Sequence, residues 1–133
     1  MEKNINTINY NLLNGGALAY IGDAVYEEKI RKYCLDKGIT SLNKLNKECV
    51  RFVSRTAQNK ISLEIEFNEV EKEIFKRGRN HNYKTKTSEY INASGFEAVI
   101  GYLYLNKNFD RLDEIIQEAI EIIEKWGANG LRI

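Results

Sequence analysis

The stretch AYIGDAVYE, residues 19–27, lies in an apolar run from residue 16 to about residue 35 that predicts the first helix. Apolar side chains recur at every fourth position, at Ala17, Ile21 and Val25. Asp23 interrupts this run, and a buried aspartate needs a cation, a hydrogen-bond donor or water. Gly22 beside it would let another backbone approach closely. The stretch therefore indicates a metal site or a partner helix; the competing interpretation is an aspartate on the exposed edge of an amphipathic helix.

Composition favours a folded, all-α protein. The 133 residues are 43% hydrophobic and 29% charged, too apolar for a disordered chain, and we expect a single domain over residues 1–133. No apolar stretch is long enough to span a membrane and the N-terminus lacks a hydrophobic signal region, so we expect a cytoplasmic protein. Cys34 and Cys49 have no metal-binding spacing and are expected to be reduced core residues. The absence of proline favours helices throughout.

Gly38 is expected to end the first helix. A second helical segment follows, with a cap at Thr40 or Ser41. Its apolar side chains reach Ala57, and the sequence allows either one long helix or two joined by a bend. The opposite face carries a stripe of four cations, at Lys44, Lys47, Arg51 and Arg55.

A shorter helix and a basic loop come next. Asn68 with Glu71 predicts a helix cap, and Gly78 is expected to stop that helix. The loop that follows, residues 76–92, contains no acid between residues 76 and 88 but several basic residues: Lys76, Arg77, Arg79, Lys84, Lys86 and His81. It is a candidate phosphate-binding surface, although a solvated loop without a ligand is an equal interpretation. The net charge of +1 conceals this patch because acids are concentrated elsewhere.

Two more helices complete the chain. Ser94 followed by Glu97 matches a capping box, which predicts a helix over residues 94–105 and gives Glu97 a structural role. Residues 109–126 carry apolar side chains at spacings of three and four, as in a core-facing helix or a coiled-coil seam.

The motifs IGDAV, KRGRN and FEAVIGYLYL, in this order, resemble the ribonuclease III catalytic domain, and specifically the small Mini-III ribonucleases without a double-stranded-RNA-binding domain. The resemblance implies an all-α homodimer, a ribonuclease III endonuclease domain built as a helical bundle, that cuts double-stranded RNA with Mg²⁺. It implies that Asp23 and Glu97 are the catalytic, metal-binding carboxylates. Longer members carry two further acids, at positions that are Ala19 and Ser94 here.

Two carboxylates suit Mg²⁺, which commonly keeps several waters and takes one or two protein carboxylates plus phosphate oxygens. We assign no catalytic role to His81, and an ion pair with Arg31 is the better interpretation of Glu27. Duplex RNA is recognised mainly through phosphates and shape, which suits basic surfaces. The residues expected to contact RNA are Lys76, Arg77, Arg79, Asn80, Lys84, Lys86, Lys47, Arg51 and Arg55.

The resemblance further implies maturation of the large-subunit (23S) ribosomal RNA precursor, with a ribosomal protein that presents the substrate as a candidate partner. Two other classes remain open. One is a non-catalytic, ribosome-associated RNA-binding protein with the same fold. The other is a helical dimerisation module, which leaves the acid-free loop and the basic stripe unexplained.

Overall fold

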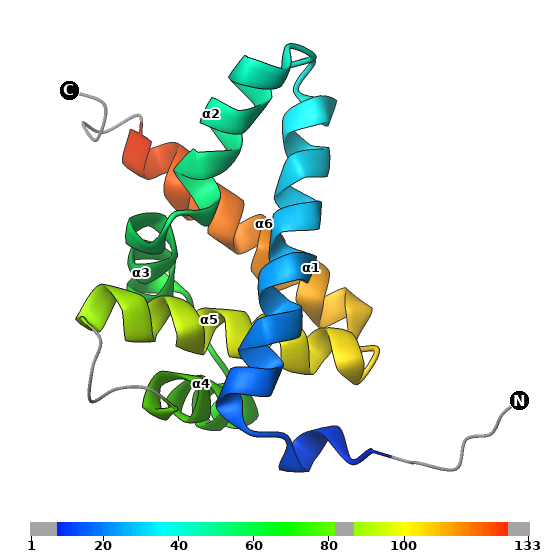
Figure 1. The fold of residues 1–133 in the computed structure, drawn as a ribbon, viewed down its shortest axis with the longest axis vertical. Coiled ribbons are helices and arrows are strands. Elements are labelled where there is room, and N and C mark those ends of the chain that lie inside the picture. Colours follow the sequence, from blue (N-terminus) through cyan, green and yellow to red (C-terminus); the bar gives the residue numbers. More distant parts are fainter. Residues whose placement is uncertain (1–7, 82–86, 128–133) are drawn as a thin grey trace, which may run out of the picture.

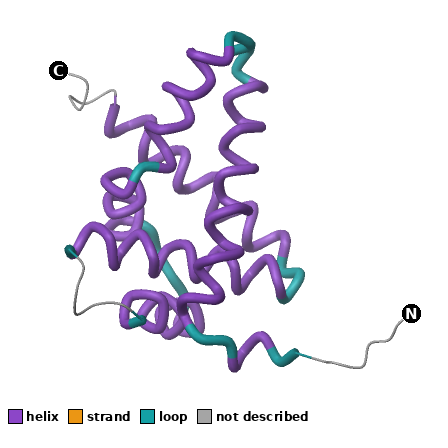
Figure 2. The backbone as a smooth tube through the Cα atoms, in the orientation of Figure 1, coloured by secondary structure: helices purple, strands orange, loops and turns teal. Residues whose placement is uncertain are grey.

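The computed structural model describes residues 8–81 and 87–127, and these residues form helices joined by short connections (Figures 1 and 2). A 3₁₀ turn precedes six α-helices, and the described residues contain no strand. The turn spans Tyr10–Leu12, and the helices are α1 Gly15–Asp36, α2 Leu42–Val53, α3 Arg55–Glu64, α4 Glu69–Asn80, α5 Ser88–Leu105 and α6 Phe109–Trp126. The all-α prediction is therefore confirmed.

Helix α5 is the element on which the others pack. It contacts α1 most extensively, then α4 and α3, and Figure 1 shows α1 crossing in front of it. Its central segment, residues 93–101, is buried except for Glu97, which is only partly covered. Apolar side chains from α6 complete the core on this side, which confirms the core-facing interpretation of residues 109–126.

Glycines allow the backbones of α1 and α5 to touch. A Cβ at Gly22 would overlap the carbonyl oxygen of Glu97, and a Cβ at Gly101 would overlap that of Leu18. Gly22 thus permits a close approach, as its sequence position predicted, but the approaching helix belongs to the same chain. It offers no support for a contact with a second molecule.

The predicted boundaries of the first half hold. Asn14 caps α1 through its side chain, and Gly38 adopts a positive φ of 90° after the helix ends. Of the two alternatives for residues 42–64, the structure has two helices, because Ser54 ends α2 and caps α3 by accepting from the Ala57 N–H at 3.2 Å. The stripe of four cations is therefore divided between two helices.

Two predicted boundaries are wrong. The capping box of Asn68 and Glu71 starts α4 as expected, but Gly78 does not stop this helix. Gly78 instead packs against Ala98 and Gly95 of α5, where a side chain would clash. A small residue serves a helix end and a close helix contact equally well, and here the contact decides.

The start of α5 is also earlier than predicted. Thr87 caps the helix by accepting from the Tyr90 N–H at 3.2 Å, so Ser94 lies in the helix interior and forms no capping box with Glu97. Cys34 and Cys49 are free and buried, as expected. None of the helices in the described ranges is long and apolar enough to cross a membrane.

Candidate active site

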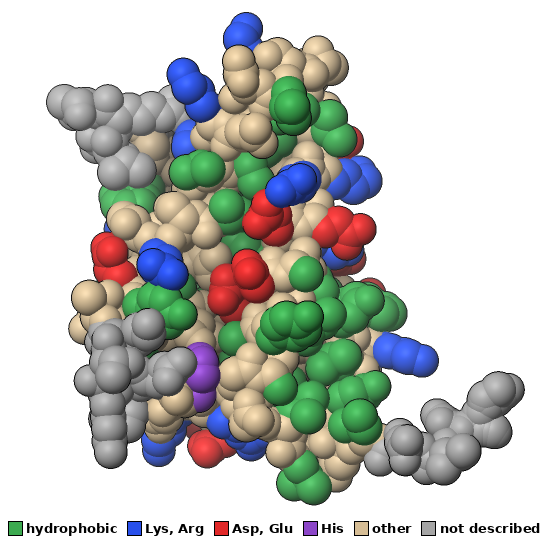
Figure 3. Space-filling view, in the orientation of Figure 1, with side chains coloured by type: hydrophobic (Ala, Val, Ile, Leu, Met, Phe, Trp, Pro, Cys, Tyr) green, Lys and Arg blue, Asp and Glu red, His purple; other side chains and the backbone are tan. Residues whose placement is uncertain are grey.

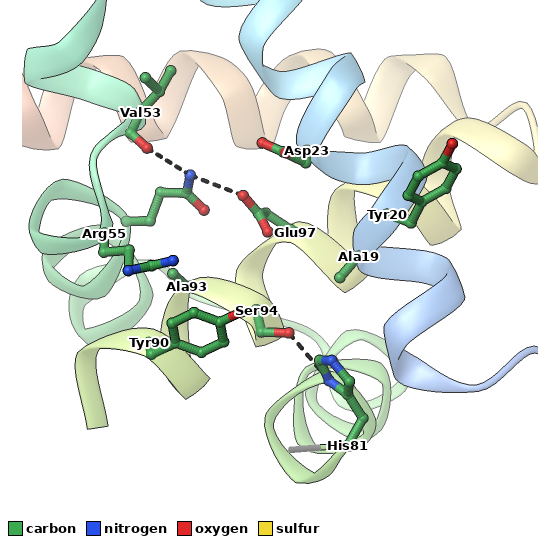
Figure 4. Close-up of a pocket in the computed structure, with 11 residues that line it drawn as sticks. Ala19, Tyr20, Asp23, Val53, Arg55, His81, Tyr90, Ala93, Ser94 and Glu97 are labelled. Carbon is green, nitrogen blue, oxygen red and sulfur yellow. Dashed lines mark hydrogen bonds between the residues drawn. The ribbon is translucent and has the colours of Figure 1, made fainter. Parts of the chain in front are cut away.

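A pocket of about 330 Å³ opens where α1, α3 and α5 meet the end of α4 (Figure 4). Each helix contributes polar side chains: Asp23 from α1, Arg55 and Gln58 from α3, Ser94 and Glu97 from α5, with His81 following α4. In Figure 3 acidic side chains gather near the centre of this face, with the histidine below them. The fold thus brings together the two carboxylates that the sequence singled out, 74 positions apart by their numbers.

Asp23 lies on the exposed side of α1, so the interpretation of an exposed edge correctly describes its position in the single chain. The same position lets it face the pocket. Gly22, the residue before it, contacts the Glu97 carbonyl, which explains why α1 brings Asp23 so close to α5. The close crossing of the two helices therefore places the two acids together.

Glu97 has an unusual environment for a carboxylate. Burial, and then the neighbouring Asp23 carboxylate, raise the pKa of Glu97 to about 8. Hydrogen bonding from Gln58 and the charge of Arg55 act in the opposite direction and do not restore the ordinary value. The Asp23 charge disfavours ionisation of Glu97, and a cation between the two carboxylates would reverse that effect.

Gln58 lines the same pocket and was not singled out from the sequence. It is 2% exposed, and its Nε2 donates to the Val53 carbonyl at 2.9 Å and to Glu97 Oε2 at 3.1 Å (Figure 4). Its Oε1 is the one buried side-chain polar atom without a hydrogen-bond partner in the described part of the chain. A glutamine between buried Ala57 and Ile61 was the available signal, since a polar residue on an apolar face needs a partner.

The remaining wall of the pocket is cationic and aromatic. The Arg55 guanidinium lies 4.2 Å from the centre of the Tyr90 ring. His81 Nδ1 lies 2.9 Å from the Gly78 carbonyl oxygen and 3.3 Å from Ser94 Oγ. Ser94 and Ala19 both line the pocket, so the two positions at which the resemblance places further acids in longer proteins belong to this site.

The donor set fits a hard divalent cation such as Mg²⁺. The described residues include no cluster of three or more His, Cys, Asp or Glu side chains that could hold a metal ion. Two adjacent carboxylates and an unpartnered amide oxygen offer only oxygen ligands and hydrogen-bond acceptors. Mg²⁺ needs few protein ligands because it retains much of its water, and binding would relieve the repulsion between the acids.

Comparison with known proteins gives the family. The Ribonuclease III domain model matches residues 16–108. The Mini-ribonuclease 3 of Streptococcus pneumoniae is 44% identical over 126 residues, covering 88% of this chain and 98% of that protein. The chain belongs to the ribonuclease III family of endoribonucleases. The Mini-ribonuclease 3 of Clostridium tetani is also 44% identical, over 88% of this chain and 83% of its own length.

A solved structure agrees with this family assignment. The crystal structure of a Fusobacterium nucleatum protein superposes with a TM-score of 0.74 at 34% identity, covering 83% of this chain and 93% of that one. Both the sequence match and the fold therefore extend over the helices that build the pocket.

The residues of this ribonuclease III domain that the sequence predicted to contact RNA occupy three kinds of position. Lys47, Lys76 and Asn80 are exposed, and Arg55 lines the pocket. Three arginines are engaged within the chain: Arg51 pairs with Glu48 and Glu124, Arg77 donates to the backbone of residues 11 and 13, and Arg79 donates to Asn92. Lys84 and Lys86 fall outside the described residues, and the segment up to residue 80, predicted as loop, belongs to α4.

Glu27 and His81 are the remaining residues for which the sequence gave an interpretation. Glu27 pairs with Arg31 through Oε2, at 2.5 Å from NH2 and 3.0 Å from Nε, which confirms the ion pair along α1. His81 lies in the pocket wall, nearer to the site than its place in a basic loop indicated.

Proposed function

We propose that the protein is a Mg²⁺-dependent endoribonuclease that hydrolyses double-stranded RNA, with Asp23 and Glu97 as the metal ligands. The observation that carries the proposal is the pairing of these two acids, from α1 and α5, in one pocket. Repulsion between them and the orphaned Gln58 Oε1 both call for a positive ion. The family membership supplies the reaction class.

The residues would divide the work of phosphodiester hydrolysis. A water oxygen forms a bond to phosphorus while the bond from phosphorus to the leaving ribose oxygen breaks, and that oxygen takes up a proton. A bound Mg²⁺ supplies Lewis-acid stabilisation of the phosphate charge and activates water. Asp23 and Glu97 hold and orient the ion. Arg55, at the pocket wall, attracts and positions the phosphate.

Contacts to the RNA backbone are proposed for exposed basic side chains and for the exposed Asn80. Lys47, Lys76, Asn80 and Arg55 are available in the described structure, and Lys84 and Lys86 remain proposals from the sequence. For Arg51, Arg77 and Arg79, binding RNA would require sharing or exchanging their present partners. We therefore expect the first group to contribute more to affinity.

A homodimer is proposed from exposed apolar side chains on α1 and α2. Tyr20 is 82% exposed and Leu42 is 71% exposed, and an apolar cleft of about 330 Å³ lies between these helices. A second copy placed against this face by two-fold symmetry would cover it. Sedimentation is expected to give a dimer, and a monomer that still cleaves RNA at micromolar concentration would contradict this part.

The last part of the proposal concerns the natural RNA substrate. We infer processing of the 23S ribosomal RNA precursor in the cytoplasm, with a ribosomal protein presenting the substrate. The support is the similarity to the Mini-ribonuclease 3 proteins.

Cleavage of a long RNA duplex in Mg²⁺ tests the function. Asp23→Asn is expected to lower the rate by at least roughly 100-fold, because charge stabilisation at a site of this kind is worth several kcal/mol. Glu28→Gln is the matched control, since Glu28 is exposed on the same helix and outside the pocket. Cleavage by Asp23→Asn at the rate of Glu28→Gln would contradict the role proposed for Asp23. Wild type that fails to cleave the duplex in Mg²⁺ would favour the non-catalytic RNA-binding alternative.

A further inference from the structure

We propose that Gln58 is a positioning residue of the metal site: its amide nitrogen fixes the Glu97 carboxylate, and its amide oxygen accepts a hydrogen bond from the hydration shell of the cation. This inference rests on the proposed function. It extends the site beyond the carboxylates to a residue of α3.

The hydrogen bonds determine the orientation of the Gln58 amide. An amide nitrogen has two hydrogens, and both are used, because Nε2 donates to the Val53 carbonyl and to Glu97 Oε2. The flipped amide would place its oxygen against these two acceptors. The network therefore fixes which end of the side chain is the free oxygen.

The bend at Ser54 brings Gln58 to this position. Val53 is the last residue of α2, so its carbonyl has no partner within that helix. Gln58 satisfies this carbonyl from the first turn of α3 and holds Glu97 with its second hydrogen. One side chain thus connects the end of α2 to the carboxylate on α5, and the direction of that carboxylate depends on it.

The Oε1 atom of Gln58 has no hydrogen-bond partner. A buried polar atom without a hydrogen bond is destabilising, so such atoms are rare and need an explanation. Within residues 8–81 and 87–127 this atom is the only buried side-chain example, and Gln58 lines the pocket that contains both acids. A hydrated cation supplies the missing donor, because its water hydrogens point away from the ion.

Two other features of the fold, an apolar cleft and a network of ion pairs, do not indicate a further ligand. The apolar cleft between α1 and α2 belongs to the proposed dimer face. The ion pairs among Lys37, Glu48, Arg51 and Glu124 satisfy one another and need no ligand. Gln58 differs from both because one of its buried polar atoms has no partner and its side chain lines the pocket of the two acids.

The test is calorimetric titration of Mg²⁺ into the RNA-free protein, with cleavage measured separately. Gln58→Leu removes the donor and the acceptor and is expected to raise the Kd for Mg²⁺ by roughly 10- to 100-fold, as for residues that orient metal ligands in other proteins. Excess Mg²⁺ should then restore much of its cleavage, since Asp23 and Glu97 are intact. Gln58→Met serves the same purpose should the leucine variant not fold.

Ser54→Ala is the matched control, because it removes the side-chain cap of α3 at the same bend and keeps the groups by which Gln58 contacts Val53 and Glu97. It is expected to lower the melting temperature and leave the Kd for Mg²⁺ within about twofold of wild type. Equal Kd values for wild type and Gln58→Leu, or equal weakening by Ser54→Ala, would overturn the inference alone. Wild type that binds no Mg²⁺ would overturn the proposed metal site and this inference together.

Discussion

Two glutamates of this chain are covered by the fold, and their neighbours differ in charge. Glu71 on α4 is 1% exposed and accepts hydrogen bonds from Arg111 at 2.8 and 2.9 Å and from the Asn68 backbone at 3.0 Å. Glu97 on α5 faces a second acid, Asp23, and accepts from an uncharged amide. Glu71 is hydrogen-bonded to its counter-charge, whereas the charge of Arg55 near Glu97 is outweighed by burial and by Asp23.

The difference appears in opposite pKa directions. Burial opposes ionisation of Glu71, but the hydrogen bonds from Arg111 and Asn68 outweigh it and lower the pKa below its ordinary value. At Glu97, burial and the Asp23 charge act together and raise the pKa to about 8. Glu71 therefore stabilises the fold when it is ionised. Ionised Glu97 destabilises the fold until a cation binds.

The largest expected effect comes from breaking the Glu71 pair. Arg111→Met leaves a buried carboxylate without its counter-charge, which typically costs about 3–5 kcal/mol of unfolding free energy. Urea unfolding at pH 7 measures this loss. Lys72→Met is the control, because its pair with Glu69 is exposed, at 61% and 92% for the two side chains, and we expect less than about 0.5 kcal/mol. Similar losses in both variants would remove the structural half of the comparison.

An effect of opposite sign is expected at Glu97. Its raised pKa means that the folded protein binds a proton more tightly than the unfolded chain, so this group lowers stability as pH rises from about 4.5 to about 8. In EDTA, Glu97→Gln should therefore be more stable than wild type at pH 8, by about 1–2 kcal/mol, with little difference at pH 4.5. Urea unfolding at both pH values measures it.

Glu71→Gln provides the counterpart under the same conditions. Its lowered pKa makes the ionised group stabilising above about pH 4.5, so this variant should be less stable than wild type at pH 8. If both glutamine variants shifted stability in the same direction at pH 8, the two glutamates would not differ as the structure indicates.

The smallest effect concerns Glu124, a carboxylate in a partly exposed ion-pair network with Lys37 and Arg51. Burial opposes its ionisation, but hydrogen bonds from Tyr33, Lys37 and Arg51 lower its pKa to about 2. Its contribution is present above about pH 4.5 and is lost as pH falls toward 2, and solvent screening limits it to about 0.5–1 kcal/mol. Glu124→Gln should reduce stability at pH 7 and converge with wild type near pH 2; a constant difference would contradict this.

Helix positions were predictable where local signals acted alone. The period of residues 16–35, the Asn68 cap and the pattern of residues 109–126 all gave the correct elements. The errors fall where tertiary contacts use the same residue types. Gly78 looked like a helix stop and is a contact with α5, and the spacing of Ser94 and Glu97 matched a cap although both residues line the pocket.

The family resemblance predicted the two acids of the site, but it did not predict the residue that holds one of them in place. Asp23 and Glu97 are far apart in sequence, and only the glycine contacts between α1 and α5 bring them together. The role of Gln58 depends on the bend at Ser54, which the sequence left open. Arg51, Arg77 and Arg79 were predicted to contact RNA, and local spacing could not show that each also has a distant partner within the chain.

The most direct test of the central claim is anomalous diffraction from crystals containing Mn²⁺, which prefers the same oxygen ligands as Mg²⁺ and can be located by its scattering. We predict one strong peak in the pocket bonded to oxygens of both Asp23 and Glu97, absent from crystals of Asp23→Asn. A peak elsewhere, or a pocket that stays empty while Mn²⁺ supports cleavage, would contradict the two-carboxylate metal site.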